Sequence, residues 1–336
     1  MRKDIALDMG GSALRIFQRG RGLIYDAPAM AAMSRENGSL MEVGREAADA
    51  DALLPGIYDI CYPLTGSLYD RLEMTVQMAE RLLRKNGLIR SRIILTVPSD
   101  LTEEEQNALL DRIDESGLKK VYLVDETVAA VMGSGTDVFL PNGTLVLHIG
   151  ATRSVVGMVS MGTLTQHQAV GIGARDFCGA IQAGVKEKHH IHISEDTARK
   201  LMVRFGGGLR QPKNRGVRIV GCSLRTGLPK KRVFTSDETA DAMEEPLTEI
   251  IRMVCAFLED VHTEYQTDIE KYGLLLTGGG AQAYGLSEIF HEMTGLKVRV
   301  AQDPANCAVI GASKFYEKLP MMSGEVNLTH SANMVM

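Results

Sequence analysis

Alternation of hydrophobic and polar positions divides this chain into short strands and amphipathic helices. Three strand-like segments separated by glycine turns open the sequence, and they lie at 4–9, 14–19 and 22–27. Such spacing predicts an antiparallel meander. Residues 30–65 show only weak periodicity, so we expect little regular helix or strand there.

Helical and strand-like patterns alternate through the rest of the chain. Apolar residues at intervals of four and three, from Met243 to Val261, predict one buried face of a long helix. Thr102 and Glu105 form a capping-box pattern at the start of another helix, which runs to about Ser116. The other expected helices lie at 68–85, 128–132, 174–188, 194–205, 286–293 and 306–318. The other expected strands lie at 93–97, 121–124, 144–149, 154–161, 164–170, 273–277 and 297–301.

The two halves of the chain share an internal repeat. Segments 5–12 and 147–154 both read as a strand, a glycine turn and a Ser or Thr that lead into a hairpin. Each half later supplies a strand, a polar turn and a helix, beginning at Ile93 and at Leu274. Two similar α/β lobes that share a cleft explain this pairing more economically than chance strand–glycine turns.

Length and composition narrow the class of protein. A chain of 336 residues favours two domains, and its net charge of −5 with 45% hydrophobic residues is typical of a soluble globular protein. No apolar run approaches the roughly 18 residues of a spanning helix, and the start of the chain does not fit a secretory signal. Five widely spaced cysteines without a CxxC pair argue against a disulfide scaffold or zinc ribbon, and favour a reducing cytoplasm. The mild acidity argues against bulk nucleic-acid binding.

Glycine turns after strands are the main chemical signal. Small residues let backbone N–H groups approach an anion closely, so the turns at 10–12 and 150–152 are suited to grip a polyphosphate from opposite sides. The turn at 278–280 is suited to pass flat beneath a nucleoside. Asp8, at a strand end beside the first turn, is placed to hold Mg²⁺ through water. Neither GxxxxGK[ST] nor GxGxxG occurs, which disfavours P-loop and dinucleotide-binding folds.

Six short segments carry a resemblance to a known family. They are Val43-Gly-Arg-Glu-Ala47, Thr96-Val-Pro-Ser99, Val121-Tyr-Leu-Val-Asp-Glu126, Thr226-Gly-Leu-Pro229, Leu276-Thr-Gly-Gly-Gly-Ala281 and Asp303-Pro with Ala308-Val-Ile-Gly311. In this order they resemble MreB, the bacterial actin of the actin, sugar-kinase and heat-shock-chaperone ATPase superfamily, from about Ile5 to Leu319. The resemblance marks a divergent member and implies an α/β, actin-like (ribonuclease-H-like) duplicated fold, with two lobes and four subdomains around a central cleft.

The resemblance also implies the subdomain boundaries. They are 1–32 and 66–143 for subdomain IA, 33–65 for IB, 144–180 and 243–319 for IIA, and 181–242 for IIB. Residues 320–336 have no pattern, and we expect a disordered tail there.

Carried over residue by residue, the resemblance implies a nucleotide site. Its nucleotide-binding positions are Gly10, Gly11, Ser12, Ala13, Gly150, Ala151, Thr152, Arg153, Gly173, Arg199, Met202, Gly278, Gly279, Gly280 and Ala281. Glu126 matches the water-positioning glutamate, and Asp8 is the expected ligand of Mg²⁺-bound water.

Several of these positions depart from the family pattern. The second phosphate loop has His148 in place of an aspartate, and a neutral imidazole replaces a carboxylate poorly around Mg²⁺. Arg153 there either neutralises phosphate charge or fills the space of a phosphate. The proline expected after Glu126 is Thr127. Losing one catalytic group commonly costs about 10²–10³-fold in rate, so we expect weak ATP or ADP binding with Mg²⁺ and at most a weak ATPase.

The resemblance implies a cytoskeletal function. We expect a cytoplasmic protein, peripheral at the inner membrane, that polymerises with itself into filaments, supports cell shape and guides the cell-wall synthesis machinery, without binding nucleic acid. Two alternatives remain open. One is a non-polymerising actin-like regulatory or scaffold protein, and the other is a small-molecule kinase of the same superfamily.

Leu88 and Ile89 are the expected membrane contact. They lie at a predicted loop tip flanked by Arg84, Lys85 and Arg90, and in the family this loop carries an apolar pair that inserts into the membrane. Two large apolar residues among cations suit an anionic lipid surface. The alternative is burial of the pair at the start of the strand that follows.

Overall fold

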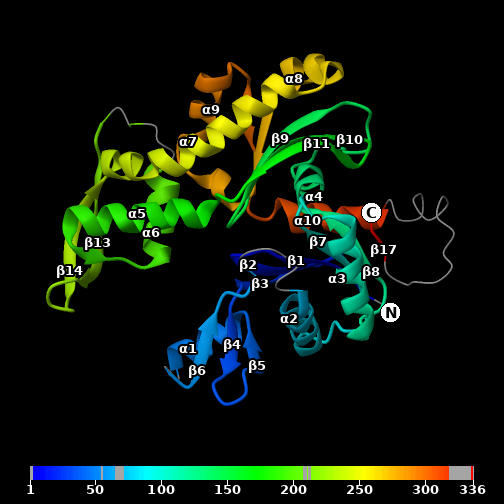
Figure 1. The fold of residues 1–336 in the computed structure, drawn as a ribbon, viewed down its shortest axis with the longest axis horizontal. Helices are drawn as coiled ribbons and strands as arrows, with labels where there is room; N and C mark the ends of the chain where they lie inside the picture. The colour runs from blue at the N-terminus through cyan, green and yellow to red at the C-terminus, as the bar shows by residue number, and fades with distance from the viewer. Residues whose placement is uncertain are drawn as a thin grey trace. The chain divides into compact units, whose positions relative to one another are not determined.

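The computed structural model describes residues 3–53, 56–64, 72–206, 210, 213–317 and 334–335. The chain divides into two compact units. The first contains residues 1–138 and 306–336, and the second contains residues 139–305. Each unit is built on its own sheet and its own hydrophobic core (Figure 1).

A six-stranded sheet, in the order β17-β8-β7-β1-β2-β3, forms the centre of the first unit. Its strands are β1 (Asp4–Met9), β2 (Ala13–Gln18), β3 (Gly22–Pro28), β7 (Arg92–Val97), β8 (Val121–Asp125) and β17 (Met334–Val335). The first three strands are antiparallel neighbours, which confirms the predicted meander. β7 and β8 run parallel to β1, so these three strands end at the same edge of the sheet.

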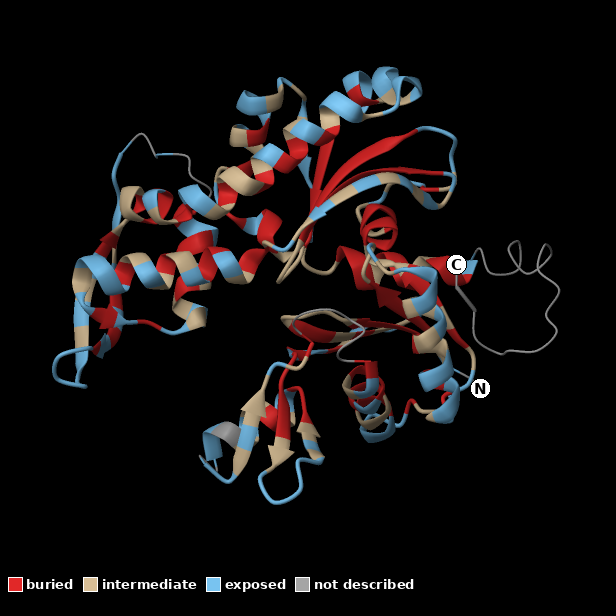
Figure 2. Cartoon of the chain, viewed as in Figure 1, coloured by how far each residue is buried: buried red, intermediate tan, exposed pale blue. Residues whose placement is uncertain are grey.

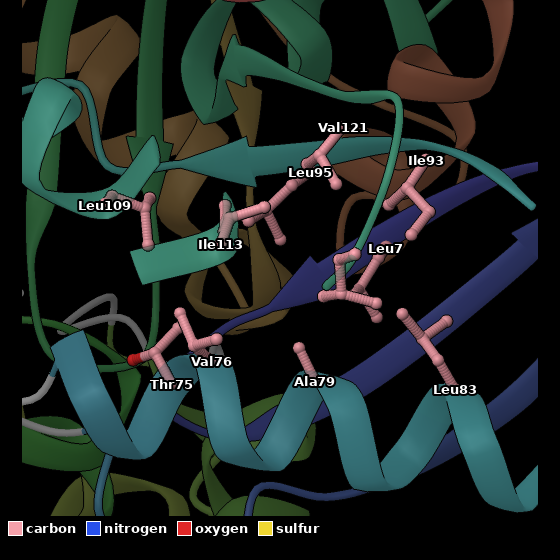
Figure 3. A pocket seen from close by; sticks show the side chains of 11 residues that line it. Leu7, Thr75, Val76, Ala79, Leu83, Ile93, Leu95, Leu109, Ile113 and Val121 are labelled. Atoms are coloured by element: carbon pink, nitrogen blue, oxygen red, sulfur yellow. The ribbon is translucent and has the colours of Figure 1, made fainter. Parts of the chain in front are cut away.

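Helices α2 (Leu72–Lys85) and α3 (Glu103–Glu115) pack their apolar sides on this sheet. Figure 3 shows side chains of both helices and of β1, β7 and β8 around a small cavity of about 10 Å³. Among the described residues, the buried Thr75 hydroxyl that lines it has no hydrogen-bond partner. The predicted capping box is confirmed, because Thr102 and Glu105 each accept a hydrogen bond from the other's backbone N–H.

The closing helix α10 (Cys307–Lys314) belongs to the first unit. It packs against α4 (Glu126–Gly133) so closely that a Cβ on Gly311 would lie 1.7 Å from the carbonyl oxygen of Ala129. The Tyr316 hydroxyl, just beyond it, lies 2.7 Å from the carbonyl oxygen of Ile5. Assigning 306–319 to the second lobe was therefore wrong, because this segment returns to the sheet on which the chain began.

The second unit repeats the topology of the first. Its sheet has the order β11-β10-β9-β15-β16, which matches β3-β2-β1-β7-β8 strand for strand. The strands are β9 (Thr144–Ile149), β10 (Ser154–Ser160), β11 (Thr163–Val170), β15 (Leu274–Thr277) and β16 (Val298–Val300). β9, β10 and β11 are antiparallel, whereas β9, β15 and β16 are parallel. The duplicated, actin-like α/β fold predicted from the sequence is thus confirmed.

Helices α5 (Ala174–His189), α7 (Ser236–Asp260), α8 (Gln266–Tyr272) and α9 (Leu286–Thr294) complete this unit. Residues 243, 247, 250, 254 and 257 of α7 are all buried, as the periodicity predicted. Figure 2 shows α7 with buried and exposed residues in turn along the helix, whereas β9 and β10 are buried throughout.

Each unit also contains an inserted segment that forms a small three-stranded sheet, separate from the central sheet of that unit. In the first unit this insert comprises β4 (Ala31–Ser34), β5 (Leu40–Val43), α1 (Arg45–Leu53) and β6 (Tyr58–Cys61). In the second it comprises β12 (Ile191–His192), α6 (Glu195–Phe205), β13 (Gly216–Ser223) and β14 (Pro229–Thr235). The expectation of little regular structure at 30–65 was wrong. Strands β4, β5 and β6 have only four residues each and do not alternate regularly between buried and exposed positions, so they are too short to show a period.

Three further expectations concern the ends and the boundaries. Of the expected disordered tail, only Met334 and Val335 lie within the described residues, and they form a strand parallel to β8. The units divide at residues 138 and 139, five residues before the expected boundary. The finer division into four subdomains stays a prediction. Within the described ranges, no helix is both long and apolar enough to cross a membrane.

Candidate functional site

The first predicted phosphate loop is a tight turn between β1 and β2. The Gly10 N–H donates to the carbonyl oxygen of Ala13 at 3.1 Å, which closes the turn around Gly11 and Ser12. These three turn residues are half-buried, whereas Ala13 is buried in β2. Within this turn, Ala13 contributes the carbonyl that accepts the Gly10 N–H, and the Ser12 carbonyl accepts the Ala29 N–H at 3.0 Å.

Asp8, immediately before this turn, is engaged on both sides of its carboxylate. The Thr96 hydroxyl donates to Oδ1 at 2.9 Å, and the Arg15 Nη1 group donates to Oδ2 at 3.4 Å. Asp8 and Arg15 lie directly opposite each other on β1 and β2, so the pair is fixed by strand register. The guanidinium already neutralises the carboxylate charge expected to hold hydrated Mg²⁺.

The second predicted phosphate loop has the same turn. The Gly150 N–H donates to the carbonyl oxygen of Arg153 at 2.9 Å, between β9 and β10. The carbonyls of Gly150 and Ala151 in turn accept the N–H groups of Ala174 and Arg175, at 2.9 Å each. The start of α5 thus holds this loop in place and uses two of its own amides to do so.

Gly173 is required by this contact. A Cβ at Gly173 would lie 2.6 Å from the carbonyl carbon of Ala151 and 2.7 Å from the backbone nitrogen of Thr152. The predicted nucleotide position Gly173 therefore has a structural role, which is to let α5 approach the loop.

His148 is the second-to-last residue of β9, as Asp8 is of β1. Its Nδ1 atom lies 3.1 Å from Oγ1 of Thr277, on the neighbouring parallel strand β15. The side chain is buried, and burial lowers the pKa of the imidazole to about 4. His148 is therefore neutral at neutral pH and brings no negative charge to the second loop. Arg153 is half-buried, and burial lowers the pKa of its guanidinium from the usual value.

The triple-glycine turn packs against the end of β9. Gly278 has φ +84°, and a Cβ there would lie 2.3 Å from the Ile149 carbonyl oxygen. A Cβ on Gly280 would lie 2.1 Å from Cγ2 of Ile149, whereas one on Gly279 would meet no atom within 4 Å. Ala281 is buried in the core. Only the middle glycine is open to a ligand, and the outer two serve close packing.

Helix α6 carries two of the predicted nucleotide-binding residues, Met202 and Arg199, and their environments differ. Met202 is only 1% exposed, so its side chain belongs to the core, and its carbonyl oxygen accepts the Tyr284 N–H at 3.2 Å. Glu195 lies between two arginines, 3.3 Å from Arg199 and 3.5 Å from Arg175. The second unit therefore brings the 150–153 loop, the triple glycine and the start of α6 together through shared contacts.

Comparison with known proteins identifies the family. The model of the MreB/Mbl protein family matches residues 2–324. The chain belongs to the MreB/Mbl family. It is 27% identical to the cell shape-determining protein Mbl of Bacillus cereus over 321 residues, which covers 94% of this chain and 96% of that protein. It is 28% identical to the cell shape-determining protein MreB of Escherichia coli K12 over 332 residues, 96% of each chain.

Solved structures show the same fold as this MreB/Mbl-family chain. MreB5 of Spiroplasma citri bound to ADP has a TM-score of 0.86 at 24% identity, over 97% of this chain and 99% of that one. A MamK double helical filament has a TM-score of 0.75 at 18% identity, over 94% of this chain and 99% of that one.

Glu126 begins α4 in the first unit of this MreB/Mbl-family chain. The helix is capped by Asp125, whose Oδ1 accepts the N–H groups of Thr127 and Val128 at 2.7 and 2.9 Å. Thr127, where the sequence resemblance predicted a proline, is fully buried, and its hydroxyl lies 2.7 Å from the Ser99 hydroxyl. Glu126 itself is half-buried, and its role in positioning water stays a prediction.

The proposed membrane pair divides into two environments. Leu88 is 2% exposed and belongs to the core of the first unit, so its assignment as a membrane contact was wrong. Its N–H also donates to the Leu83 carbonyl at 2.7 Å, which folds the residue back under α2. Ile89 is half-exposed and packs only partly against that core.

Sequence reasoning missed Arg15 as part of the site of this MreB/Mbl-family member. A tight hairpin closed at 10–13 pairs Met9 with Leu14, and therefore Asp8 with Arg15. This count along the two strands is the signal that would have found it. Thr277 gives no comparable signal, because its partner His148 lies 129 residues away in the sequence.

Proposed function

We propose that this chain polymerises into filaments at the inner face of the cytoplasmic membrane, where it supports cell shape and guides the cell-wall synthesis machinery. The observation that carries the proposal is the family match, which spans residues 2–324 of the 336. The relatives are named cell shape-determining proteins, and the MamK neighbour forms a double helical filament.

The proposal includes a nucleotide site of reduced competence. MreB5 of Spiroplasma citri binds ADP and AMPPNP in its two structures. In this chain residues 10–13 and 150–153 each form a tight, glycine-containing turn after a strand, and Gly279 leaves open space beside the second turn. These features support weak binding of ATP or ADP.

The residues present do not fit the expected Mg²⁺. Asp8 is paired with a guanidinium, and its counterpart His148 is a neutral imidazole hydrogen-bonded to Thr277. Hard cations prefer oxygen ligands that carry negative charge. Since phosphoryl transfer depends mostly on positioning and on charge stabilisation by metal ions, we infer slow or absent hydrolysis.

Contact with the membrane is proposed at Ile89 alone. Ile89 lines a hollow of about 630 Å³ in the first unit. The cations that line the same hollow are Lys3, Arg84, Arg90 and Lys119. A half-exposed apolar residue beside such cations suits an anionic lipid surface. Of these cations, Arg84 forms an ion pair with Glu80.

Sedimentation of the full chain followed by electron microscopy tests the proposal. The protein is compared with Mg²⁺ and ATP, with ADP, and with EDTA alone, and phosphate release is followed in parallel for the protein and for Glu126→Ala. We expect filaments in all three conditions and phosphate release that Glu126→Ala does not change. A protein that stays monomeric throughout contradicts the filament proposal and favours a scaffold. Release of ADP stimulated by a sugar or acetate favours a kinase.

A further inference from the structure

Four polar side chains form a continuous row across the sheet of the first unit. Thr96 on β7 donates to Asp8 on β1, Asp8 faces Arg15 on β2, and Arg15 faces Asp26 on β3. Directly opposed residues on neighbouring strands share one face of a sheet. Because Asp8 lies two residues before the turn at 10–13, this row lies beside the first phosphate loop.

Arg15 is held at the centre of this row between two carboxylates. Its Nη1 group lies 3.4 Å from Oδ2 of Asp8, and its Nε atom lies 3.3 Å from Oδ1 of Asp26. The second contact is a charge contact without hydrogen-bond geometry, because Nε is buried and makes no hydrogen bond. The side chain of Arg15 is 18% exposed and that of Asp8 is 10% exposed, whereas Asp26 is half-exposed. The guanidinium is therefore a fixed part of the sheet.

A fixed guanidinium changes what Asp8 can bind. A carboxylate that holds a hydrated divalent cation must face that cation with its own negative charge. Here the charge is already paired at short range, and a second cation placed at Asp8 is repelled by Arg15. This repulsion comes from the geometry, because Arg15 lies directly opposite Asp8 on the neighbouring strand.

We propose that Arg15 is a built-in cation that takes the place of Mg²⁺ at Asp8, so that the first phosphate loop binds its phosphate ligand without a divalent ion. The proposal rests on the nucleotide site proposed above and extends it, because it names the group that replaces the metal.

Binding of Mn²⁺, used as a spectroscopic probe for Mg²⁺, tests the proposal directly. Electron paramagnetic resonance measures free Mn²⁺ in titrations of the full chain and of the single variants Arg15→Leu, Arg15→Lys and Asp8→Asn. The double variant Arg15→Leu with Asp8→Asn is titrated in the same way. We expect no saturable site in the parent protein or in Arg15→Lys. In Arg15→Leu we expect a site at least tenfold tighter than any in the parent, and its loss in the double variant.

Two outcomes overturn the proposal. One is a Mn²⁺ site in the parent protein that Asp8→Asn removes, and the other is a folded Arg15→Leu protein that gains no site. If Arg15→Leu does not fold, the proposal is tested instead by measuring the nucleotide affinity of the parent protein in Mg²⁺ and in EDTA. Equal affinity within about twofold in Mg²⁺ and in EDTA supports the proposal, and a tenfold loss in EDTA overturns it. Filament formation is scored separately, so failure of the polymerisation proposal leaves the Mn²⁺ result interpretable.

Discussion

His148 Nδ1 lies 3.1 Å from Oγ1 of Thr277, and the two residues are paired on the parallel strands β9 and β15. The first unit contains the same relationship between Asp8 and Thr96, on the parallel strands β1 and β7. In both units a polar residue at the end of the first strand bonds a threonine on the next parallel strand. The duplicated architecture thus contains the same hydrogen bond with a carboxylate in the first unit and an imidazole in the second.

Folding stability is expected to depend on pH through His148. Burial lowers its pKa from 6.5 to about 4, so between these values the unfolded chain binds the proton and the folded chain does not. Stability from this residue is therefore complete above pH 6.5 and is lost as the pH falls toward 4. At 1.36 kcal/mol per pKa unit, the loss is of the order of 3 kcal/mol.

Urea unfolding at a series of pH values, for the parent protein and for His148→Asn, measures this contribution. Asparagine can place a polar atom near the former position of the His148 Nδ1 atom and does not titrate. The variant should therefore lose less stability than the parent protein between pH 6.5 and pH 4. Thr277→Val is the matched control, because it removes the hydrogen bond and keeps the buried imidazole. Parallel pH profiles for the parent and His148→Asn contradict the prediction.

Substitutions in the triple-glycine turn should distinguish an effect on folding from an effect on ligand binding. Gly278→Ala places a Cβ 2.3 Å from the Ile149 carbonyl oxygen at a φ of +84°, and we expect a loss of about 2–4 kcal/mol in the free energy of unfolding. Gly279→Ala meets no atom within 4 Å, so its stability should change by less than about 0.5 kcal/mol. If a nucleoside lies over this turn, Gly279→Ala weakens its binding several-fold.

Fluorescent-nucleotide titration and urea unfolding of both variants provide the measurements. The informative result is a stable Gly279→Ala protein with reduced nucleotide affinity. A Gly279→Ala protein with unchanged affinity removes the middle glycine from the proposed site, and a fully stable Gly278→Ala protein contradicts the packing argument.

Leu88 and Ile89 should respond differently to the same substitution. Leu88→Ser puts a hydroxyl into the core and opens a cavity, so we expect a loss of about 2–5 kcal/mol in stability. Ile89→Ser should leave stability nearly unchanged and reduce co-sedimentation with vesicles that contain anionic lipid. Neutral vesicles are the control, since the cations around Ile89 gain nothing from them. Unaltered pelleting of Ile89→Ser would remove the membrane contact from this loop.

Periodicity predicted the long elements because their faces are fully buried. The α7 face and the two glycine-turn hairpins are such cases, and their repetition was enough to indicate a duplicated fold. The inserted strands β4 to β6 have only four residues each and do not alternate regularly between buried and exposed positions, so no pattern distinguished them. In the site, sequence placed the turns at 10–13 and 150–153 correctly on strand ends. The sequence could not show that Arg15 forms an ion pair with Asp8 or that Met202 is buried, because both features depend on neighbouring residues in the tertiary structure.

Placement of the closing helix in the first unit can be tested with two helical glycines. Gly311 in α10 has no room for a Cβ, which would lie 1.7 Å from the Ala129 carbonyl oxygen and 2.6 Å from the backbone nitrogen of Gly133. We expect Gly311→Ala to force α10 away from α4, at about 3 kcal/mol or more. Gly179, in α5 of the second unit, has open space around the same position, so Gly179→Ala should be stabilising by about 0.5–1 kcal/mol, because alanine restricts the unfolded chain. Hydrogen exchange during urea unfolding assigns each effect to a unit. Because α10 packs in the first unit, Gly311→Ala should reduce the protection of amides in β1 and β7. A loss of protection confined to β9 and β15 would show that this helix belongs to the second unit.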